Sequence, residues 1–167
     1  MVDSAVTSLL LSHGLHMRPA PAPTPVPRVL LVDDNRDGLV VRTLLLEEAG
    51  FQVQAAACAD EALGLFSSTR FDVVVTDYRM PGMNGAELIQ QLRACDAHAR
   101  FIVLSGFVEP LGLTEANTGA DAVIAKSANE GAHLLRWVKR LASGSFRKPM
   151  ATQSVERQRA RQGNLAH

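Results

Sequence analysis

The feature that most constrains this chain is an apolar run that ends in an acid and is followed by a turn. Residues 73–75 are three consecutive valines, which is typical of a strand buried on both faces of a sheet. Asp77 comes two residues later, and Pro81-Gly82 predicts a turn. We therefore expect Asp77 at the carboxyl end of a central strand, where open α/β sheets bind their ligands.

A second acidic cluster follows another apolar run. Residues 28–32 read RVLLV and lead into Asp33-Asp34. Two parallel strands that end in carboxylates at the same edge of a sheet bring three acids together, and these acids repel one another. A hard divalent cation relieves that repulsion, and Mg²⁺ suits a few carboxylates, waters and a phosphate. The residues therefore predict a phosphoryl site built on Mg²⁺.

Strand and helix patterns alternate five times along the chain. We expect strands at 28–32, 51–55, 73–76, 101–105 and 122–125, and helices at 36–49, 59–68, 85–94 and 128–142. Pro110 and Gly112 disfavour a regular helix in 107–118, so only a short one is expected, at 113–118. Such alternation predicts an α/β fold, a doubly wound five-stranded parallel sheet with helices on both faces.

Three local patterns add detail to the helices. Asn84 with Glu87 and Ser127 with Glu130 have the spacing of capping boxes at two helix starts. Gly50 suits the position just after the first helix. The buried side of that first helix is expected to hold four apolar residues, Val41, Leu44, Leu45 and Ala49.

The charge distribution predicts a compact part between two appendages. Lys plus Arg equals Asp plus Glu at 17 each, so net charge selects no class of partner. We expect a domain at 28–142, a disordered proline-rich extension at 1–27 and a disordered basic tail at 143–167. The extension is read as a stiff tether, with a docking peptide as the alternative. We do not expect nucleic acid as a partner, because the residues from 144 onward hold only five basic side chains.

Cysteine use and hydropathy bear on location. Cys58 and Cys95 lack the spacing of metal ligands, so free thiols in a reducing compartment are expected. No apolar run approaches the length that spans a bilayer, and the first residues lack the basic region of a secretion signal. These features predict a cytoplasmic protein that contacts no membrane.

Reactive groups end four of the five expected strands, in the order Asp33-Asp34, Asp77, Ser105 and Lys126. This series resembles the receiver domain of two-component response regulators, of the stand-alone, chemotaxis-regulator-like kind. The segments that carry the resemblance are LLVDDN ending at residue 35, VVVTDYRMPGMNG at 73–85, VLSG at 103–106 and GADAVIAK at 119–126. The resemblance implies a flavodoxin-like sheet with strand order 2-1-3-4-5.

The resemblance also implies a set of metal ligands. By position, Asp34 matches the direct Mg²⁺ ligand, and Asp33 matches the acid that holds the metal through water. Asp77 contributes a carboxylate oxygen, and the backbone carbonyl of Arg79 matches the remaining protein ligand.

Asp77 matches the phosphoacceptor, which takes a phosphoryl group from a histidine of a sensor kinase or a phosphotransfer protein. Ser105 and Lys126 match the hydroxyl and the ammonium that bind the phosphoryl oxygens. Arg79 and Phe107 flank the site, and we hypothesise that they shield the acyl phosphate from water; ordinary packed or solvated residues are the alternative.

The chain departs from the family pattern at three places. Ser127 follows the lysine, where the family usually has a proline in a cis bond, and Val123 stands where an aromatic residue usually reports phosphorylation. The region around Pro110 and Gly112 replaces a longer helix. We expect phosphate acceptance to be intact and its readout to be modified.

The resemblance implies a single-domain response regulator that signals by altered docking to an unidentified protein, with slow autodephosphorylation instead of enzymatic turnover. One alternative is a receiver-like interaction module with a degenerate switch. A weaker one is an aspartate-nucleophile phosphohydrolase, which needs an acid two residues after the nucleophile, where this chain has Arg79. Dimerisation through 107–142 stays open.

Overall fold

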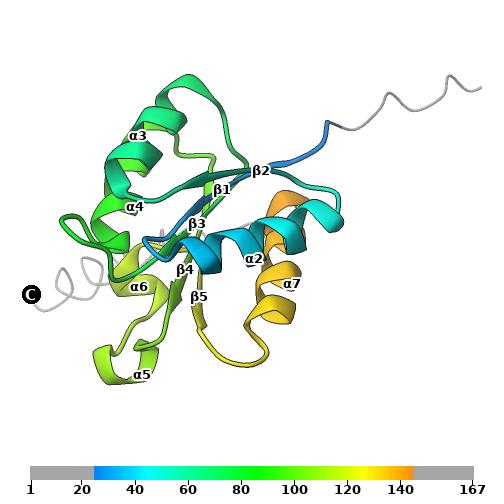
Figure 1. Ribbon diagram of the computed structural model, residues 1–167. Helices are drawn as coiled ribbons and strands as arrows, with labels where there is room; N and C mark the ends of the chain where they lie inside the picture. The colour runs from blue at the N-terminus through cyan, green and yellow to red at the C-terminus, as the bar shows by residue number, and fades with distance from the viewer. Residues whose placement is uncertain (1–24, 145–167) are drawn as a thin grey trace, which may run out of the picture.

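The structure is a computed structural model that describes residues 25–144, and its centre is one parallel sheet (Figure 1). Hydrogen-bonded neighbours run in the order β2-β1-β3-β4-β5. The strands are β1 (Arg28–Val32), β2 (Gln52–Ala56), β3 (Val73–Asp77), β4 (Arg100–Ser105) and β5 (Ala122–Ala125). The expected fold class and strand order are confirmed.

Helices cover both faces of the sheet. They are α2 (Arg36–Glu48), α3 (Ala59–Ser68), α4 (Gly85–Cys95), α5 (Val108–Leu111), α6 (Glu115–Thr118) and α7 (Glu130–Ala142). In Figure 1, α2 and α7 lie on one side of the sheet, and α3, α4 and α6 lie on the other. Each face therefore has its own hydrophobic core.

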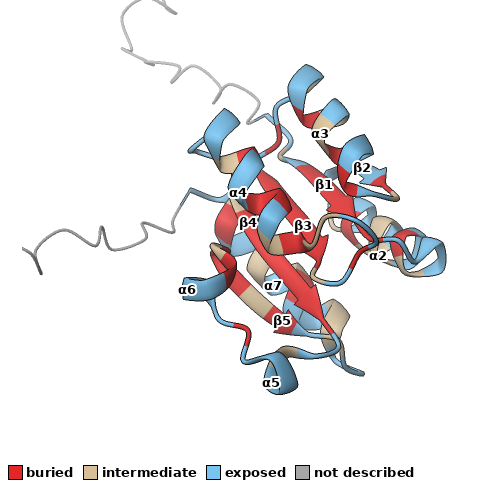
Figure 2. Cartoon of the chain, turned by 90° about the vertical axis from the view of Figure 1, so that its left-hand side faces the viewer, coloured by how far each residue is buried: buried red, intermediate tan, exposed pale blue. Residues whose placement is uncertain are grey.

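The strands supply alternate residues to these two cores. On the α2–α7 side the sheet contributes Val29, Leu31, Val73 and Val75, which pack with helical residues such as Leu46 and Leu134. On the α3–α4 side it contributes Leu30, Val32 and Val74, which pack with residues such as Ala62 and Leu88. Figure 2 shows the central strands as buried and the outer helix surfaces as exposed. Burial on both faces explains why β1 and β3 read as nearly continuous apolar runs.

Two of the expected helix ends are confirmed. Asn84 caps α4: its side chain accepts hydrogen bonds from the backbone N–H groups of Ala86 and Glu87. The Glu87 carboxylate in turn accepts a hydrogen bond from the backbone N–H of Asn84. Gly50 follows α2 with a φ of 91°, a left-handed conformation that favours glycine.

The start of α7 differs from the expectation. The helix begins at Glu130, with Asn129 as its N-cap and no side-chain capping bond. The expected Ser127–Glu130 capping box is wrong, because the Glu130 carboxylate pairs with Arg42 on α2 instead.

The buried face of α2 was also predicted wrongly. Leu39 and Leu46 are buried, whereas Val41 and Leu44 have exposed fractions of 66% and 56%. Leu45 and Ala49 are only partly buried. Apolar residues occur on several sides of α2, so its periodicity does not decide which side packs on the sheet.

The 107–118 region forms two single-turn helices, α5 and α6, instead of one at 113–118. Pro110 fits in α5 because N–H groups in the first turn have no intrahelical acceptor. Gly112 ends α5 with a φ of 57°.

Cys58 and Cys95 form no disulfide, in line with the expected free thiols, and both are exposed. No helix among residues 25–144 is both long enough and apolar enough to cross a membrane. The expectations for the proline-rich extension and the basic tail fall almost entirely on 1–24 and 145–167, outside the described residues.

Candidate functional site

The site lies at the carboxyl edge of the sheet, where β1 and β3 end side by side. Val32 pairs with Thr76 in the register of these strands, so the next residues, Asp33 and Asp77, are brought together. One carboxylate oxygen from each of Asp33, Asp34 and Asp77 lies within 4.8 Å of the others. Asp33 and Asp77 are buried, whereas Asp34 is exposed. The predicted acidic cluster therefore exists in three dimensions.

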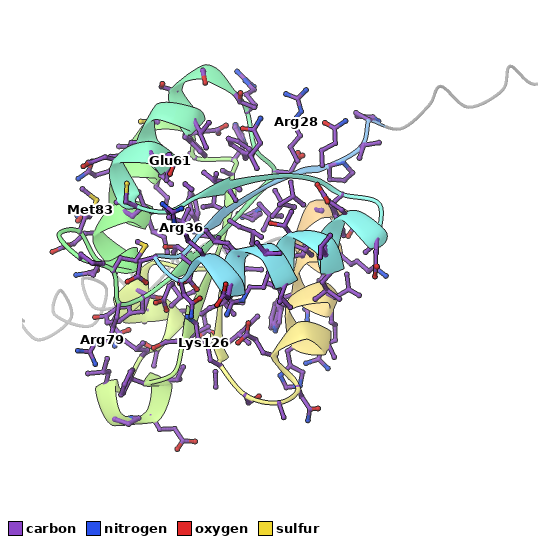
Figure 3. The ribbon with its side chains drawn as sticks, in the orientation of Figure 1. Arg28, Arg36, Glu61, Arg79, Met83 and Lys126 are labelled. Carbon is purple, nitrogen blue, oxygen red and sulfur yellow. The ribbon has the colours of Figure 1, made fainter. Side chains whose placement is uncertain are left out.

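Lys126 brings an ammonium group into the same cluster. It follows β5, and its Nζ lies 3.0 Å from Oδ2 of Asp33 and 3.1 Å from Oδ1 of Asp77. Its backbone N–H donates to the carbonyl of Ser105, which ties the ends of β4 and β5 together. The Lys126–Ser127 peptide bond is trans. Figure 3 labels Lys126 and Arg79 at this end of the sheet and Arg28 at the opposite end.

The carboxylate of Asp77 sits in a constrained environment. The residue is 8% exposed, and Oδ1 accepts a hydrogen bond of 2.9 Å from the backbone N–H of Tyr78. Burial raises the pKa of Asp77 above its ordinary value, and the charge of Asp33 adds to this rise. The ammonium of Lys126 and the Tyr78 N–H act in the opposite direction without cancelling it.

Ser105 and the two flanking residues lie on neighbouring turns. Ser105 is buried at the end of β4, and its hydroxyl accepts a hydrogen bond of 3.0 Å from the backbone N–H of Phe107. The guanidinium carbon of Arg79 lies 4.7 Å from the centroid of the Phe107 ring, a cation–π contact. Both side chains are exposed. The loops after β3 and β4 therefore touch beside Asp77.

Two predicted positions are less directly connected to the cluster. The role of the Arg79 carbonyl as a metal ligand stays a prediction. Val123, in the middle of β5, is partly buried and packs against the core on the α3–α4 side, beside Val103 of β4.

Sequence reasoning missed Arg42 and Glu130. Nη1 of Arg42 lies 2.9 Å from Oδ2 of Asp33, and its Nε donates to Oε1 of Glu130 at the start of α7. Burial opposes the charge of Arg42, but the hydrogen bond and charge of Glu130, together with Asp33, raise its pKa above the ordinary value. Arg42 is therefore a permanent cation of the site. No local pattern indicates the pair, because Arg42 and Glu130 are 88 residues apart.

The donor set fits Mg²⁺. Its members are carboxylate oxygens, the hard ligands that this ion prefers, and one of them, Asp34, is open to solvent for the waters that Mg²⁺ retains. Lys126 and Arg42 supply two positive charges that partly offset the three acids in the structure as it stands. Asp33, Asp34 and Asp77 are accordingly the side chains that could hold the ion.

Comparison with known proteins agrees with the geometry. The family model described as the response regulator receiver domain matches residues 29–139. A response regulator receiver protein from Anaeromyxobacter is 44% identical over 81 residues, which are 48% of this chain and 34% of that protein. The virulence sensor protein BvgS of Bordetella bronchiseptica is 39% identical over 93 residues, 53% of this chain and 8% of that protein.

Among solved structures, the response regulator TrrA of Thermotoga maritima, in complex with Mg²⁺ and BeF, has a TM-score of 0.63 and 30% identity. The match covers 70% of this chain and 99% of TrrA. The chain thus spans nearly the whole of the TrrA structure but about a third, or less, of the curated relatives described above. By its sequence, its strand order and its converging acids, this chain belongs to the response regulator receiver domain family.

Proposed function

We propose that this chain is a response regulator that accepts a phosphoryl group on Asp77 from a phosphohistidine of a sensor histidine kinase or a histidine phosphotransfer protein. The observation that carries the proposal is the convergence of the Asp33, Asp34 and Asp77 oxygens with the Lys126 ammonium at one edge of the sheet. In the transfer, a carboxylate oxygen of Asp77 forms a bond to phosphorus. The phosphorus–nitrogen bond of the donor breaks, and its electron pair stays on the imidazole.

The residues around Asp77 are arranged for this step. The Tyr78 N–H fixes Oδ1 of Asp77, and Lys126 is already in contact with the same oxygen. As the phosphoryl group arrives, the Lys126 ammonium is placed to pair with one of its oxygens, and the Ser105 hydroxyl can turn from the Phe107 N–H to another. Mg²⁺, when bound by the three acids, supplies charge that offsets the phosphoryl oxygens.

The exposed side of α2 is a suitable docking surface for the donor. Val40, Val41 and Leu44, which we call the α2 patch, have exposed fractions of 58%, 66% and 56%. The helix starts two residues after Asp34, so the patch lies on the element that leaves the acidic cluster directly. Apolar surface of this kind is typical of protein interaction sites. We assign it to a phosphohistidine-bearing helix of the donor.

Incubation with acetyl phosphate and Mg²⁺, followed by intact mass measurement, tests the proposal. The wild-type chain should gain the mass of one phosphoryl group, and the gain should disappear with EDTA. Asp77→Asn should gain nothing, whereas Asp72→Asn, which replaces an acid at the opposite end of the sheet, should label like the wild type. Labelling that persists in Asp77→Asn, or no labelling of the wild type, would contradict the proposal.

A second candidate is an interaction module of the same family that docks without a switch. Val123 on β5 favours it, because no aromatic ring is available there to report phosphorylation. The two functions differ in a binding measurement. A switch requires that phosphorylated and unphosphorylated chains bind the downstream partner differently, whereas a module without one binds equally in both states.

A further inference from the structure

The guanidinium of Arg42 contacts two carboxylates, one in the acidic cluster and one at the start of helix α7. Nη1 contacts Oδ2 of Asp33, and Nε donates to Oε1 of Glu130. The three side chains are largely buried, with exposed fractions of 12% for Arg42, 4% for Asp33 and 15% for Glu130. Contacts made at this depth are screened less by solvent and salt than contacts on the surface.

Both oxygens of Asp33 are engaged by donors from the chain. Oδ2 lies 2.9 Å from Nη1 of Arg42 and 3.0 Å from Nζ of Lys126, and Oδ1 accepts a hydrogen bond of 2.8 Å from the N–H of Asn35. A cation that approaches Asp33 therefore competes with two positive side chains for the same oxygen.

Glu130 is a second carboxylate with which Arg42 can stay paired. It lies in the first turn of α7, and α7 approaches α2 closely there: a Cβ at Gly131 would lie 3.2 Å from Cδ2 of Leu45. Arg42 can therefore release Asp33 while it keeps Glu130, so the buried guanidinium is never left without a carboxylate.

We propose that Arg42 is a positioning residue of the metal site: it competes with Mg²⁺ for Asp33, and Glu130 holds it aside when the ion binds. The pair thereby sets the affinity for Mg²⁺ and links the metal site to the start of α7. This inference rests on the proposed function, because it takes Asp33, Asp34 and Asp77 as the Mg²⁺ ligands.

The proposal makes the two partners act in opposite directions. Without Arg42, one competitor for Asp33 and one positive charge are lost, so Mg²⁺ should bind more tightly. Without Glu130, Arg42 has only Asp33 to pair with and one negative charge is lost, so Mg²⁺ should bind more weakly.

Isothermal titration calorimetry of the full chain with MgCl₂ measures this directly. We expect Arg42→Gln to lower the dissociation constant about fivefold and Glu130→Gln to raise it about fivefold, as coupling between neighbouring charges allows. Because Glu130 acts through Arg42, the double variant should bind Mg²⁺ like Arg42→Gln, whereas simple addition of the two single changes would return the dissociation constant to the wild-type value. Arg42→Lys, whose single ammonium cannot hold both carboxylates in the same way, should fall between wild type and Arg42→Gln.

Matched controls separate this mechanism from bulk charge. Arg136→Gln on α7 and Glu48→Gln on α2 make the same charge changes at exposed positions and should leave the dissociation constant within about twofold of the wild type. The inference is overturned if Arg42→Gln behaves like Arg136→Gln, or if it weakens Mg²⁺ binding. A wild-type chain that binds no Mg²⁺ at millimolar concentration would instead contradict the proposed function itself.

Discussion

Lys126 reaches Asp77 across the end of an intervening strand. Its Nζ lies 3.1 Å from Oδ1 of Asp77, although β4 separates β5 from β3 in the sheet. The lysine thus bridges the ends of strands that share no ladder hydrogen bonds. Burial raises the pKa of Asp77, and the charge of Asp33 adds to the rise. The ammonium of Lys126 lowers this pKa but does not bring it back to its ordinary value.

The raised pKa predicts that Asp77→Asn stabilises the metal-free chain at neutral pH. A carboxyl group with a raised pKa in the folded state binds its proton more tightly there than in the unfolded chain. Its contribution to stability is therefore present below the unfolded pKa and is lost as pH rises through the folded pKa. A neutral amide avoids this loss, so thermal unfolding of Asp77→Asn at pH 7.5 in EDTA should occur about 2–5 °C higher than in wild type.

The same argument predicts how the difference in melting temperature between Asp77→Asn and the wild type depends on pH. The two melting temperatures should converge as pH falls below the ordinary Asp pKa of 3.8, where wild-type Asp77 becomes protonated in both the folded and the unfolded state. Asp60→Asn, at an exposed position in the first turn of α3, is the control and should not gain stability. A less stable Asp77→Asn at pH 7.5 would show that the Lys126 contact outweighs burial.

Signals confined to a few neighbouring residues predicted the strands and most helix ends. The valines at 73–75 indicate a strand with both faces covered, because only such a strand is apolar at consecutive positions. The Asn84–Glu87 pattern indicated the start of α4, since both hydrogen bonds of that cap are local. Once the strands are parallel, their carboxyl ends meet, and the cluster of Asp33, Asp34 and Asp77 follows.

Long-range contacts account for what the sequence did not predict. Ser127 and Glu130 have capping-box spacing, but the Glu130 carboxylate is drawn to Arg42, which is 88 residues away. The apolar residues of α2 lie on several sides, so only packing against β1, β2 and α7 decides that Leu39 and Leu46 face inward. Because the orientation of α2 was not predictable, neither was the position of Arg42 beside Asp33.

Gly85→Ala should destabilise the fold and disturb the site together. A Cβ at this position would collide with the backbone carbonyl oxygen of Asp77, and the Gly85 N–H already donates to the Tyr78 carbonyl. Backbone atoms cannot move aside as a flexible side chain can, so we expect a loss of about 1–3 kcal/mol in the free energy of unfolding. Labelling by acetyl phosphate should also slow, because the displaced atoms belong to Asp77, the proposed phosphoacceptor.

Gly64→Ala provides the matched control for this substitution. Gly64 lies inside α3, and a Cβ there meets no atom within 4 Å. Alanine should stabilise the chain by about 0.5–1 kcal/mol through its better helix propensity, with labelling unchanged. Urea denaturation of both variants checks the pair, and equal behaviour of Gly85→Ala and Gly64→Ala would contradict the predicted clash.

Arg79→Ala and Phe107→Ala should shorten the lifetime of the acyl phosphate. The cation–π contact between these exposed side chains joins the loops after β3 and β4 beside Asp77, where it can hinder attacking water. Such contacts are worth about 0.5–1 kcal/mol at exposed sites, which corresponds to a two- to fivefold faster loss of the phosphoryl group. The decay of labelled protein after removal of acetyl phosphate measures this. Leu111→Ala, exposed on α5, is the control, and decay at the wild-type rate in both test variants would remove the shielding role.

Polar substitution in the α2 patch should separate donor recognition from the chemistry at Asp77. Val41→Gln combined with Leu44→Gln removes apolar surface that is exposed in the free chain, so the fold should be preserved. Labelling by acetyl phosphate needs no protein contact and should match the wild type. Transfer from a phosphorylated kinase needs a docked complex and should fall about tenfold. The kinase for this test is whichever of the organism's sensor kinases transfers its phosphoryl group to the wild-type chain fastest when all of them are compared.

Val26→Gln is the control. It replaces a similarly exposed apolar residue, next to β1 at the amino edge of the sheet, and should leave both reactions unchanged. Equal kinase transfer to the α2 variant and to Val26→Gln would show that the donor docks elsewhere.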